Sequence, residues 1–361
     1  MKIFQCQNCG QIVFFENTYC VSCQSQLGFL PAEMTLLTLS THDQGISSFT
    51  NPEQQLKYCQ NFQMGGCNWL LPADSKDCFC LACQLNNLIP DLSDEEHRLE
   101  WVRIEVAKHR LVYELLSLGL PVVGKNLDPE TGLSFDFLSN DMMENGEQVM
   151  TGHMQGLITL NTDEADPVLR ERIKAQMAEP YRTLIGHFRH EIGHYYWDLL
   201  VRPTANKLEM FRALFGDEGE NYQEALNQHY QDGPPADWRE QFVSAYASSH
   251  PWEDWAETWA HYLHLIATMQ TAQSYGLGLQ PALPSPSNRA LSMDLTLNYD
   301  LLEHRDMEFI LTDWLKLTLA VNSLNRSMGQ SDLYPFVLPA RVREKLQFIH
   351  QFIIAYRHRE L

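Results

Sequence analysis

The sequence predicts an α+β protein in which a small cysteine-rich part precedes a mainly helical part that contains a small antiparallel sheet. Two observations carry this prediction. All nine cysteines lie between Cys6 and Cys83, and long apolar repeats at helical spacing begin only after Pro90. The chain has 361 residues, of which 44% are hydrophobic and 20% charged, so it has a globular composition and room for two or three domains. We expect domains at 1–30, 31–90 and 91–361.

The charge balance argues against a nucleic-acid partner. The 26 basic and 46 acidic residues give a formal net charge of −20, and a polyanion is repelled by such a chain at long range. No apolar run approaches the ~20 residues that cross a bilayer, and the first residues lack the basic and apolar regions of a secretory signal. We therefore expect a soluble cytoplasmic protein without a membrane partner.

The first range contains two C-x-x-C pairs, formed by Cys6, Cys9, Cys20 and Cys23. In a reducing compartment this clustering is typical of metal ligation rather than of disulfides. Four thiolates form a closed zinc site, which replaces the hydrophobic core that a thirty-residue module cannot build. With a strand expected at 12–15, the segment resembles a zinc ribbon with a structural zinc ion. The alternative, a pair of redox motifs, lacks the βαβ context that it needs.

The second range combines a connector with further cysteines. Residues 31–56 are rich in Ser, Thr, Gly, Asn and Pro with little periodicity, so we expect a loop there. The remaining five cysteines are Cys59, Cys67, Cys78, Cys80 and Cys83. Cys80 and Cys83 form a C-x-x-C pair, and Cys59 with Cys67 can complete a second structural zinc site, which leaves Cys78 over. The alternative is that some of these cysteines are small buried hydrophobes.

The third range begins with a helix and a sheet. Ser93-x-x-Glu96 looks like a capping box that opens a helix, which ends before Gly119 and Pro121. Strands are expected at 133–138 and 156–161, with a turn at 144–147 between them. These strands predict the small antiparallel sheet.

Helices are expected over most of the remaining chain. Asp166-Pro167 is a favourable helix start, and Pro180 breaks the helix after about Glu179. The later expected elements are a helix carrying 187–194, short helices within 204–240, a long helix from about Pro251 to Thr271, a loop at 279–288 and two amphipathic helices at the end of the chain.

The helix over 187–194 contains one H-E-x-x-H motif, from His190 through Glu191 to His194. Two histidines four positions apart on a helix project from one face, so both imidazoles reach one metal ion while Glu191 borders its open side. This arrangement is typical of a zinc hydrolase. The alternative is a surface helix with two solvated histidines.

Zinc held by two histidines still needs a third protein ligand. A metzincin would continue the motif with Gly and a third His, but Trp197 and Leu200 occupy those positions, which excludes that class. The third ligand is therefore expected elsewhere, and the segment 250–264 is the best source.

Glu253 and Glu257 lie one helical turn apart in that segment. We expect Glu253 to bind the metal and Glu257 to accept a hydrogen bond from a ligand histidine. The alternative is a solvated acidic face. The same segment, however, carries the aromatic residues Trp252, Trp255, Trp259 and Tyr262. Carboxylates buried among such rings are costly unless they are paired or bound to a metal. His261 and His264 are rival ligands. Tyr246 is either a donor to an oxyanion or a core tyrosine, and spacing alone does not decide.

The chain resembles bacterial zinc-binding metallopeptidases that carry an N-terminal zinc ribbon, and the resemblance covers nearly its whole length. It is carried by the two C-x-x-C pairs of the first range, by Cys67-Asn68-Trp69, by Cys80-x-x-Cys83-Gln84-Leu85 with Ile89-Pro90-Asp91-Leu92, by Phe188-Arg189-His190-Glu191-Ile192-Gly193-His194-Tyr195-Tyr196-Trp197, and by Tyr246-Ala247-Ser248-Ser249-His250-Pro251-Trp252-Glu253-Asp254. The resemblance implies a zincin-like peptidase domain that acts on a peptide or protein substrate.

A second resemblance is to the catalytic domain of anthrax lethal factor, a gluzincin-type peptidase with a tyrosine seven residues before a zinc-binding glutamate in an E-x-x-A-E string. It implies that Tyr246 donates to the oxyanion, that Glu253 is the ligand and that Glu257 supports a ligand histidine. In this chain 58 residues separate His194 from Glu253, and the insertion 204–240 has no counterpart. Substrate specificity therefore does not carry over.

These observations predict a gluzincin-type zinc peptidase with one catalytic and two structural zinc ions. Zinc held by His190, His194 and Glu253 would lower the pKa of its bound water from ~15.7 toward ~7, and Glu191 would carry that proton to the leaving amine. The strand 156–161 is expected to be the edge with which an extended peptide pairs. The alternative function is a zinc-stabilised scaffold whose ribbon docks a protein partner.

Overall fold

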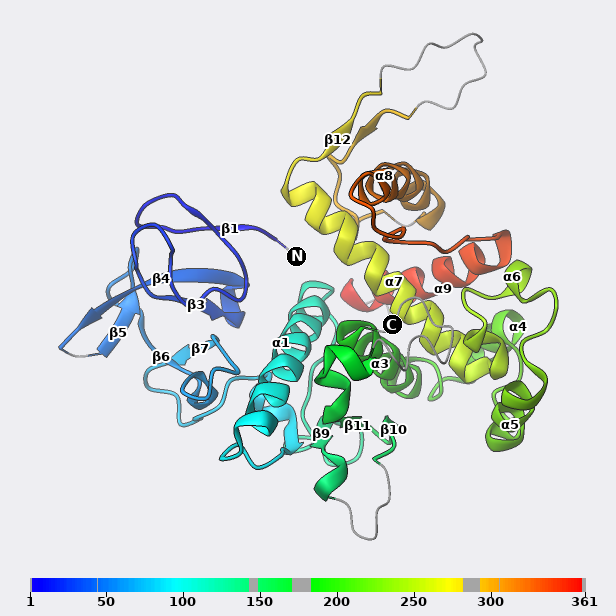
Figure 1. Ribbon diagram of the computed structural model, residues 1–361, viewed down its shortest axis with the longest axis horizontal. Helices are drawn as coiled ribbons and strands as arrows, with labels where there is room; N and C mark the ends of the chain where they lie inside the picture. The colour runs from blue at the N-terminus through cyan, green and yellow to red at the C-terminus, as the bar shows by residue number, and fades with distance from the viewer. Residues whose placement is uncertain are drawn as a thin grey trace. The chain divides into compact units, whose positions relative to one another are not determined.

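The computed structural model describes residues 2–43, 45–142, 149–170, 183–281, 293–304 and 306–358. The chain divides into two compact units, Lys2–Leu199 and Leu200–Leu361. The cysteine-rich segments and the small sheets of the first unit precede a mainly helical remainder, which confirms the predicted α+β class (Figure 1). The three domain ranges expected from the sequence stay a prediction.

The cysteine-rich part of the first unit is built on strands. A hairpin of β1 (Phe4–Gln5) and β2 (Ile12–Val13) comes first. A five-stranded antiparallel sheet follows, in the order β3 (Leu27–Leu30), β4 (Thr35–His42), β5 (Gly45–Ser48), β6 (Gln55–Tyr58) and β7 (Leu70–Pro72).

The sheet shows that the loop predicted at 31–56 is wrong. Leucines of four of its strands form a buried apolar cluster of Leu30, Leu37, Leu39, Leu56 and Leu70. The Ser and Thr residues between them suggested a loop by composition, yet threonine fits a half-buried pleated surface well, and Thr38 in β4 is fully buried. Burial of the leucines therefore decides the conformation of this segment.

An aromatic cluster joins this sheet to the first long helix, α1 (Glu95–Ser117). The ring of Phe29 in β3 lies 4.9 Å from that of Phe15, 5.0 Å from that of Trp69 and 5.6 Å from that of Tyr113 on α1. Edge and tilted contacts of this kind add to the stabilisation from burial. The helix begins one residue later than the predicted capping box, because Asp94 rather than Ser93 accepts from the backbone N–H groups of the first turn.

The second sheet of this unit has the order β10 (Gly152–Met154), β11 (Leu157–Asn161), β9 (Ser134–Leu138) and β8 (Asn86–Leu88). It is mixed rather than antiparallel. The pairs β8·β9 and β9·β11 are parallel, and only β10·β11 is antiparallel. The parallel pair β8·β9 arises because α1 forms a crossover between the two strands. The turn predicted at 144–147 lies outside the described residues.

The strand expected to pair with a peptide substrate is an interior strand. β11 is bonded to β10 on one side and to β9 on the other. The two-residue turn that joins β10 to β11 has positive φ at Gln155 (49°) and Gly156 (81°), as a tight hairpin of this kind requires. The predicted edge is therefore wrong, because this short hairpin covers it.

Helix α3 (Leu184–Leu200) carries the H-E-x-x-H motif and packs on this sheet. The ring of Phe188 contacts those of Phe135 and Phe137 in β9, with centroids 5.6 and 6.2 Å away. On another face of α3, the guanidinium of Arg189 forms two hydrogen bonds to the carboxylate of Glu114 on α1, and both side chains are buried. Of the helix predicted from Asp166, the described residues are helical as far as Arg170, and the rest lies outside them.

The unit Leu200–Leu361 is mainly helical, as predicted. Its elements are α4 (Ala205–Phe215), α5 (Tyr222–Asp232), α6 (Trp238–Gln241), α7 (Pro251–Ser274), α8 (Met307–Ser327), α9 (Ala340–Arg357) and the short hairpin of β12 (Gly278–Leu279) and β13 (Leu295–Thr296). The loop predicted at 279–288 lies mostly outside the described residues.

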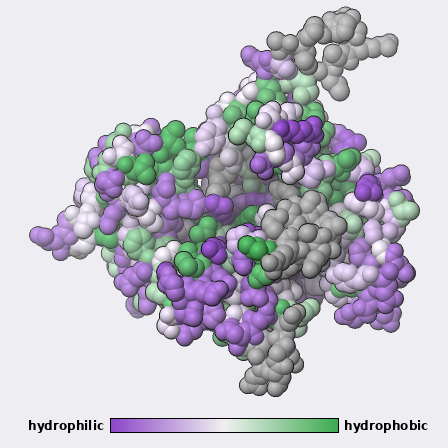
Figure 2. All heavy atoms as spheres, in the orientation of Figure 1, coloured by the Kyte–Doolittle hydropathy of each residue, from purple (hydrophilic) through white to green (hydrophobic). Residues whose placement is uncertain are grey.

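Helix α7 forms the centre of this unit, and α5 lies at its surface. A buried ion pair of 2.6 Å joins Asp254 on α7 to Lys345 on α9. Helix α5 has no buried residues, and Figure 2 shows hydrophilic side chains over it on the face in view. Within the described ranges, no helix combines the length and the apolar character that a membrane span requires.

Glu114→Leu should destabilise the unit Lys2–Leu199 by about 3–5 kcal/mol, because it leaves the Arg189 guanidinium buried without its carboxylate. Urea unfolding followed by circular dichroism measures this change. Glu95→Gln, which breaks the exposed pair of 2.6 Å with Arg98 on the same helix, is the control and should leave the midpoint nearly unchanged. Equal midpoints for the two variants would contradict the assigned role of the buried pair.

Candidate metal centres and active site

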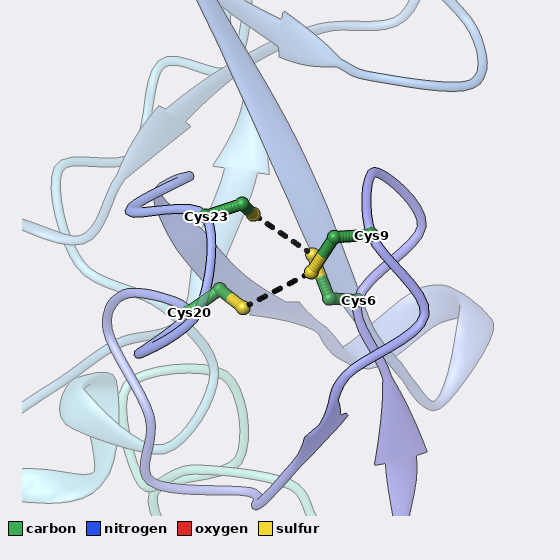
Figure 3. A group of neighbouring side chains, drawn as sticks. All are labelled: Cys6, Cys9, Cys20 and Cys23. Carbon is green, nitrogen blue, oxygen red and sulfur yellow. Dashed lines mark hydrogen bonds between the residues drawn. The ribbon is translucent and has the colours of Figure 1, made fainter.

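The first cysteine cluster combines two loops of the ribbon (Figure 3). The Sγ atoms of Cys6 and Cys23 lie 3.6 Å apart, as do those of Cys9 and Cys20. All four sulfur atoms lie within 4.8 Å of one another. Four ligands at about 2.3 Å from one zinc ion in a tetrahedron are separated by about 3.8 Å, so the cluster fits a structural zinc ion.

The second cluster consists of the four predicted cysteines of the next range, Cys59, Cys67, Cys80 and Cys83, and all four are buried. The sulfur atoms of Cys67 and Cys80 lie 3.7 Å apart. The backbone N–H of Cys80 donates to Cys59 Sγ at 3.3 Å, as expected around a thiolate. Cys78 is exposed and lies outside the cluster. Its exclusion leaves a set of four thiolates that also fits zinc.

A histidine that no sequence motif indicated lies beside the second cluster. His109 of α1 is buried, and its Nε2 lies 3.7 Å from Cys83 Sγ and 3.9 Å from Cys80 Sγ. Its Nδ1 lies 2.7 Å from the backbone carbonyl of Glu105. Burial lowers the pKa of His109, but the neighbouring Cys83 outweighs that effect and raises it. The ring can thus donate to thiolate sulfur and offset part of the charge of a buried four-cysteine site.

The side chains of the two histidines of the H-E-x-x-H motif lie close together. The Nε2 atoms of His190 and His194 lie 3.2 Å apart, one helical turn from each other on α3. The ring of His153 in β10 is stacked on that of His194, with centroids 6.2 Å apart and an interplanar angle of 15°. Two imidazole nitrogens so close together can share one metal ion.

Glu191 lies beside these histidines and is buried. Its Oε1 is 3.2 Å from Nε2 of His187, whose Nδ1 is 2.6 Å from Oε2 of Glu164. Burial would raise the pKa of Glu191, but the hydrogen bond to His187 and the charges of nearby histidines hold it below its usual value. Burial would likewise lower the pKa of His187, yet Glu164 and Glu191 raise it to about 10. Of these partners, only His187 was visible in the sequence, as a member of the polar face of the motif helix.

The residues predicted to complete the site lie in the unit Leu200–Leu361. Glu253 follows the start of α7, where Nδ1 of His250 accepts from the backbone N–H of Trp252 and caps the helix. The buried Glu253 carboxylate accepts a hydrogen bond of 2.7 Å from the hydroxyl of Tyr222 on α5. Glu257 accepts one of 2.6 Å from the Ser244 hydroxyl.

Tyr246 lies in a short 3-10 helix (Tyr246–Ser249) just before α7. Burial raises the pKa of its phenol strongly, and the nearby carboxylates of Glu253 and Glu257 raise it further. The phenol therefore keeps its proton at neutral pH and can act as a donor. The contact with Tyr222 comes from the insertion 204–240, in which the sequence predicted short helices but no functional residue.

The rival ligand His261 is engaged within the same unit. Its Nδ1 lies 2.8 Å from the hydroxyl of Tyr334, and its ring contacts that of Phe336 with centroids 4.4 Å apart. Burial lowers the pKa of His261 to about 4. His264 is also buried on α7.

Removal of one ligand from the second cysteine cluster should cost the chain about one zinc ion. Cys67→Ser deletes a buried thiolate of the cluster, whereas Cys78→Ser deletes an exposed thiol outside it. Elemental analysis of the purified full chain gives the zinc content of both variants. Loss of zinc in Cys78→Ser to the same extent would show that the ligand set is wrong.

Acidification should destabilise the unit Leu200–Leu361 through His261. Burial lowers the pKa of His261 in the folded protein to about 4, from the ordinary value of 6.5. The stability that depends on neutral His261 is therefore fully present above pH 6.5 and is lost as the pH falls toward 4. Between pH 7 and 5 the loss is on the order of 2 kcal/mol. His261→Gln should flatten the pH dependence of the unfolding free energy measured in urea, while exposed His358→Gln should leave it as in the wild type. An unchanged slope in His261→Gln would contradict the assignment.

Comparison with known proteins places this chain in a family. An uncharacterized protein of Mycobacterium bovis and two from strains of Mycobacterium tuberculosis are each 43% identical to the chain over 353 residues, covering 98% of this chain and 95% of theirs. No solved structure matches. Residues 3–94 match a zinc-ribbon domain, and residues 97–352 match the family described as "Putative zinc-binding metallo-peptidase". The chain therefore belongs to this zinc-binding metallo-peptidase family and carries an N-terminal zinc-ribbon domain.

Proposed function

We propose that the protein is a gluzincin-type zinc peptidase that hydrolyses peptide bonds. The observation that carries the proposal is the convergence of His190 and His194, whose Nε2 atoms lie 3.2 Å apart, beside the buried carboxylate of Glu191. This combination supplies two neutral nitrogen ligands and an adjacent base on one helix. Membership of the metallo-peptidase family supports the peptide as the substrate class.

The proposed third ligand is Glu253. Two imidazoles and one carboxylate form a donor set that suits a catalytic zinc ion and leaves a position open. The Tyr222 hydroxyl fixes one oxygen of this carboxylate, and Glu257 is the proposed hydrogen-bond partner of a ligand histidine. When bound, zinc supplies a Lewis acid that makes water more acidic and polarises the scissile carbonyl.

The chain's own residues then move the proton and stabilise the charge. Glu191 takes a proton from the attacking water and delivers it to the leaving amine. Its lowered pKa keeps it ionised at neutral pH, as this role requires. The phenol of Tyr246, whose pKa is raised by burial, donates to the oxyanion.

The outer strand of the mixed sheet is the proposed docking edge for a peptide. Within the described part of that sheet, β10 is the end strand on one side, and its His153 is stacked on His194. An extended peptide that adds to an exposed strand gains main-chain hydrogen bonds without requiring a particular sequence. Cleavage should therefore depend on extended substrate conformation more than on a single side chain.

Glu191→Gln should reduce turnover by about 10²- to 10⁴-fold while the zinc content stays at the wild-type level, because the amide cannot accept the proton. The assay follows new amino termini in a peptide library prepared from a digested bacterial proteome, incubated with zinc-loaded full-length protein. Glu130→Gln, a change of an exposed carboxylate in the same unit, is the matched control.

Two outcomes would contradict the assignment. Loss of one zinc ion in Glu191→Gln would make this residue a ligand rather than the base. A wild-type protein that is loaded with three zinc ions and cleaves no peptide would favour the scaffold function instead.

A further inference from the structure

We propose that His187 and Glu164 are positioning residues that hold the carboxylate of Glu191 in the orientation from which it takes a proton. The inference rests on the proposed function, because Glu191 is the base assigned there. All three residues belong to the unit Lys2–Leu199.

His187 lies between two carboxylates. Its Nδ1 is 2.6 Å from Oε2 of Glu164, and its Nε2 is 3.2 Å from Oε1 of Glu191. The spacing of four residues on α3 places His187 and Glu191 on one face of the helix. Ionised carboxylates only accept hydrogen bonds, so a ring that donates from both nitrogens satisfies both partners. The side chains are 15%, 8% and 7% exposed for His187, Glu164 and Glu191, so water competes little with these bonds.

Glu164 is itself held in place. It lies in the short 3-10 helix Thr162–Ala165, directly after β11. Its second carboxylate oxygen accepts a hydrogen bond of 2.8 Å from the Thr151 hydroxyl, and its backbone carbonyl accepts one of 2.7 Å from Arg170. Thr151, next to β10, and Arg170 thereby hold Glu164 in place, and Glu164 holds the ring of His187.

The chemical consequence concerns the two oxygens of Glu191. While Oε1 accepts from His187, the other oxygen can receive the proton of the attacking water and later return it to the leaving amine. His187 gains and loses no proton in this cycle. An unanchored glutamate side chain would sample several rotamers and would lose conformational entropy when it adopts the reactive one. A side chain that is already held in that rotamer avoids this cost during the reaction.

A purely structural link between the 3-10 helix and α3 would act differently. It would contribute to the stability of the unit, and its removal would lower the fraction of folded protein. The turnover of each folded, zinc-loaded molecule would stay the same. The ratio of kcat to zinc-loaded protein therefore separates the two roles.

His187→Ala should lower kcat by about 10- to 100-fold with KM within about twofold of the wild type and with zinc content unchanged. Glu164→Ala should act in the same direction. Glu164→Gln keeps an acceptor for the His187 ring and should recover most of the loss. His97→Ala is the control, since it removes a histidine–carboxylate pair of 3.4 Å with Asp141 that belongs to the same unit but does not involve Glu191. The assay uses peptides that the wild-type protein cleaves.

A second measurement does not depend on activity. In full-length protein with ¹⁵N-labelled histidine, both ring nitrogens of His187 should carry a hydrogen-bonded proton, and Glu191→Gln should shift the Nε2–H resonance. Glu164→Ala should shift the Nδ1–H resonance instead. The spectra are compared in the zinc-loaded and the chelator-treated protein.

The outcomes separate this inference from the proposed function. An unchanged kcat in His187→Ala, alongside an inactive Glu191→Gln, would overturn the positioning role and leave the peptidase assignment intact. A wild-type protein that cleaves nothing would overturn the peptidase assignment, and with it the role of Glu191 as a base, while the resonance shifts would still report the hydrogen bonds. A His187 resonance that does not respond to Glu191→Gln would overturn the inference in either case.

Discussion

The position of the motif helix depends on one buried ion pair. Arg189 immediately precedes His190, and its guanidinium forms a two-pronged hydrogen bond with Glu114 of α1. Planar bidentate pairs of this kind fix orientation as well as distance. A neighbouring face of the helix is held by Phe188 against β9. Because these two contacts hold neighbouring faces of α3, the faces that carry His190, Glu191 and His194 have a defined direction relative to the sheet.

The parts of the structure that could be predicted are those whose chemistry repeats at a fixed local spacing. The C-x-x-C pairs identified both cysteine clusters, and the metal motif with its apolar neighbours identified α3. The long helix predicted from about Pro251 to Thr271 corresponds to α7. In each case neighbours in the sequence interact with one another or with one ion. The assignment of Glu253 and Tyr246 to the same catalytic site as His190 stays a prediction, because it links distant segments.

The parts that could not be predicted depend on contacts between distant segments. The composition of residues 31–56 predicts a loop, whereas the leucines of β4 are buried by neighbouring strands. His109 contacts Cys83 of the second cysteine cluster although the two residues are 26 positions apart in the sequence. Glu164 and His187 are in contact although they are 23 positions apart. No local period encodes such pairs. The predicted antiparallel pairing of 133–138 with 156–161 is likewise wrong, because β10 lies between β9 and β11 in the sequence and itself forms the antiparallel pair with β11.

The hydrogen bond from Tyr222 to Glu253 links the inserted helix α5 to a proposed metal ligand. Under the proposed ligand assignment, the Tyr222 hydroxyl would limit rotation of the Glu253 carboxylate and so keep it oriented for binding a metal ion. Helix α5, which carries this tyrosine, has no buried residues of its own. Under that assignment, a tyrosine on a surface helix would influence the rate at which the protein exchanges its metal with the surrounding medium.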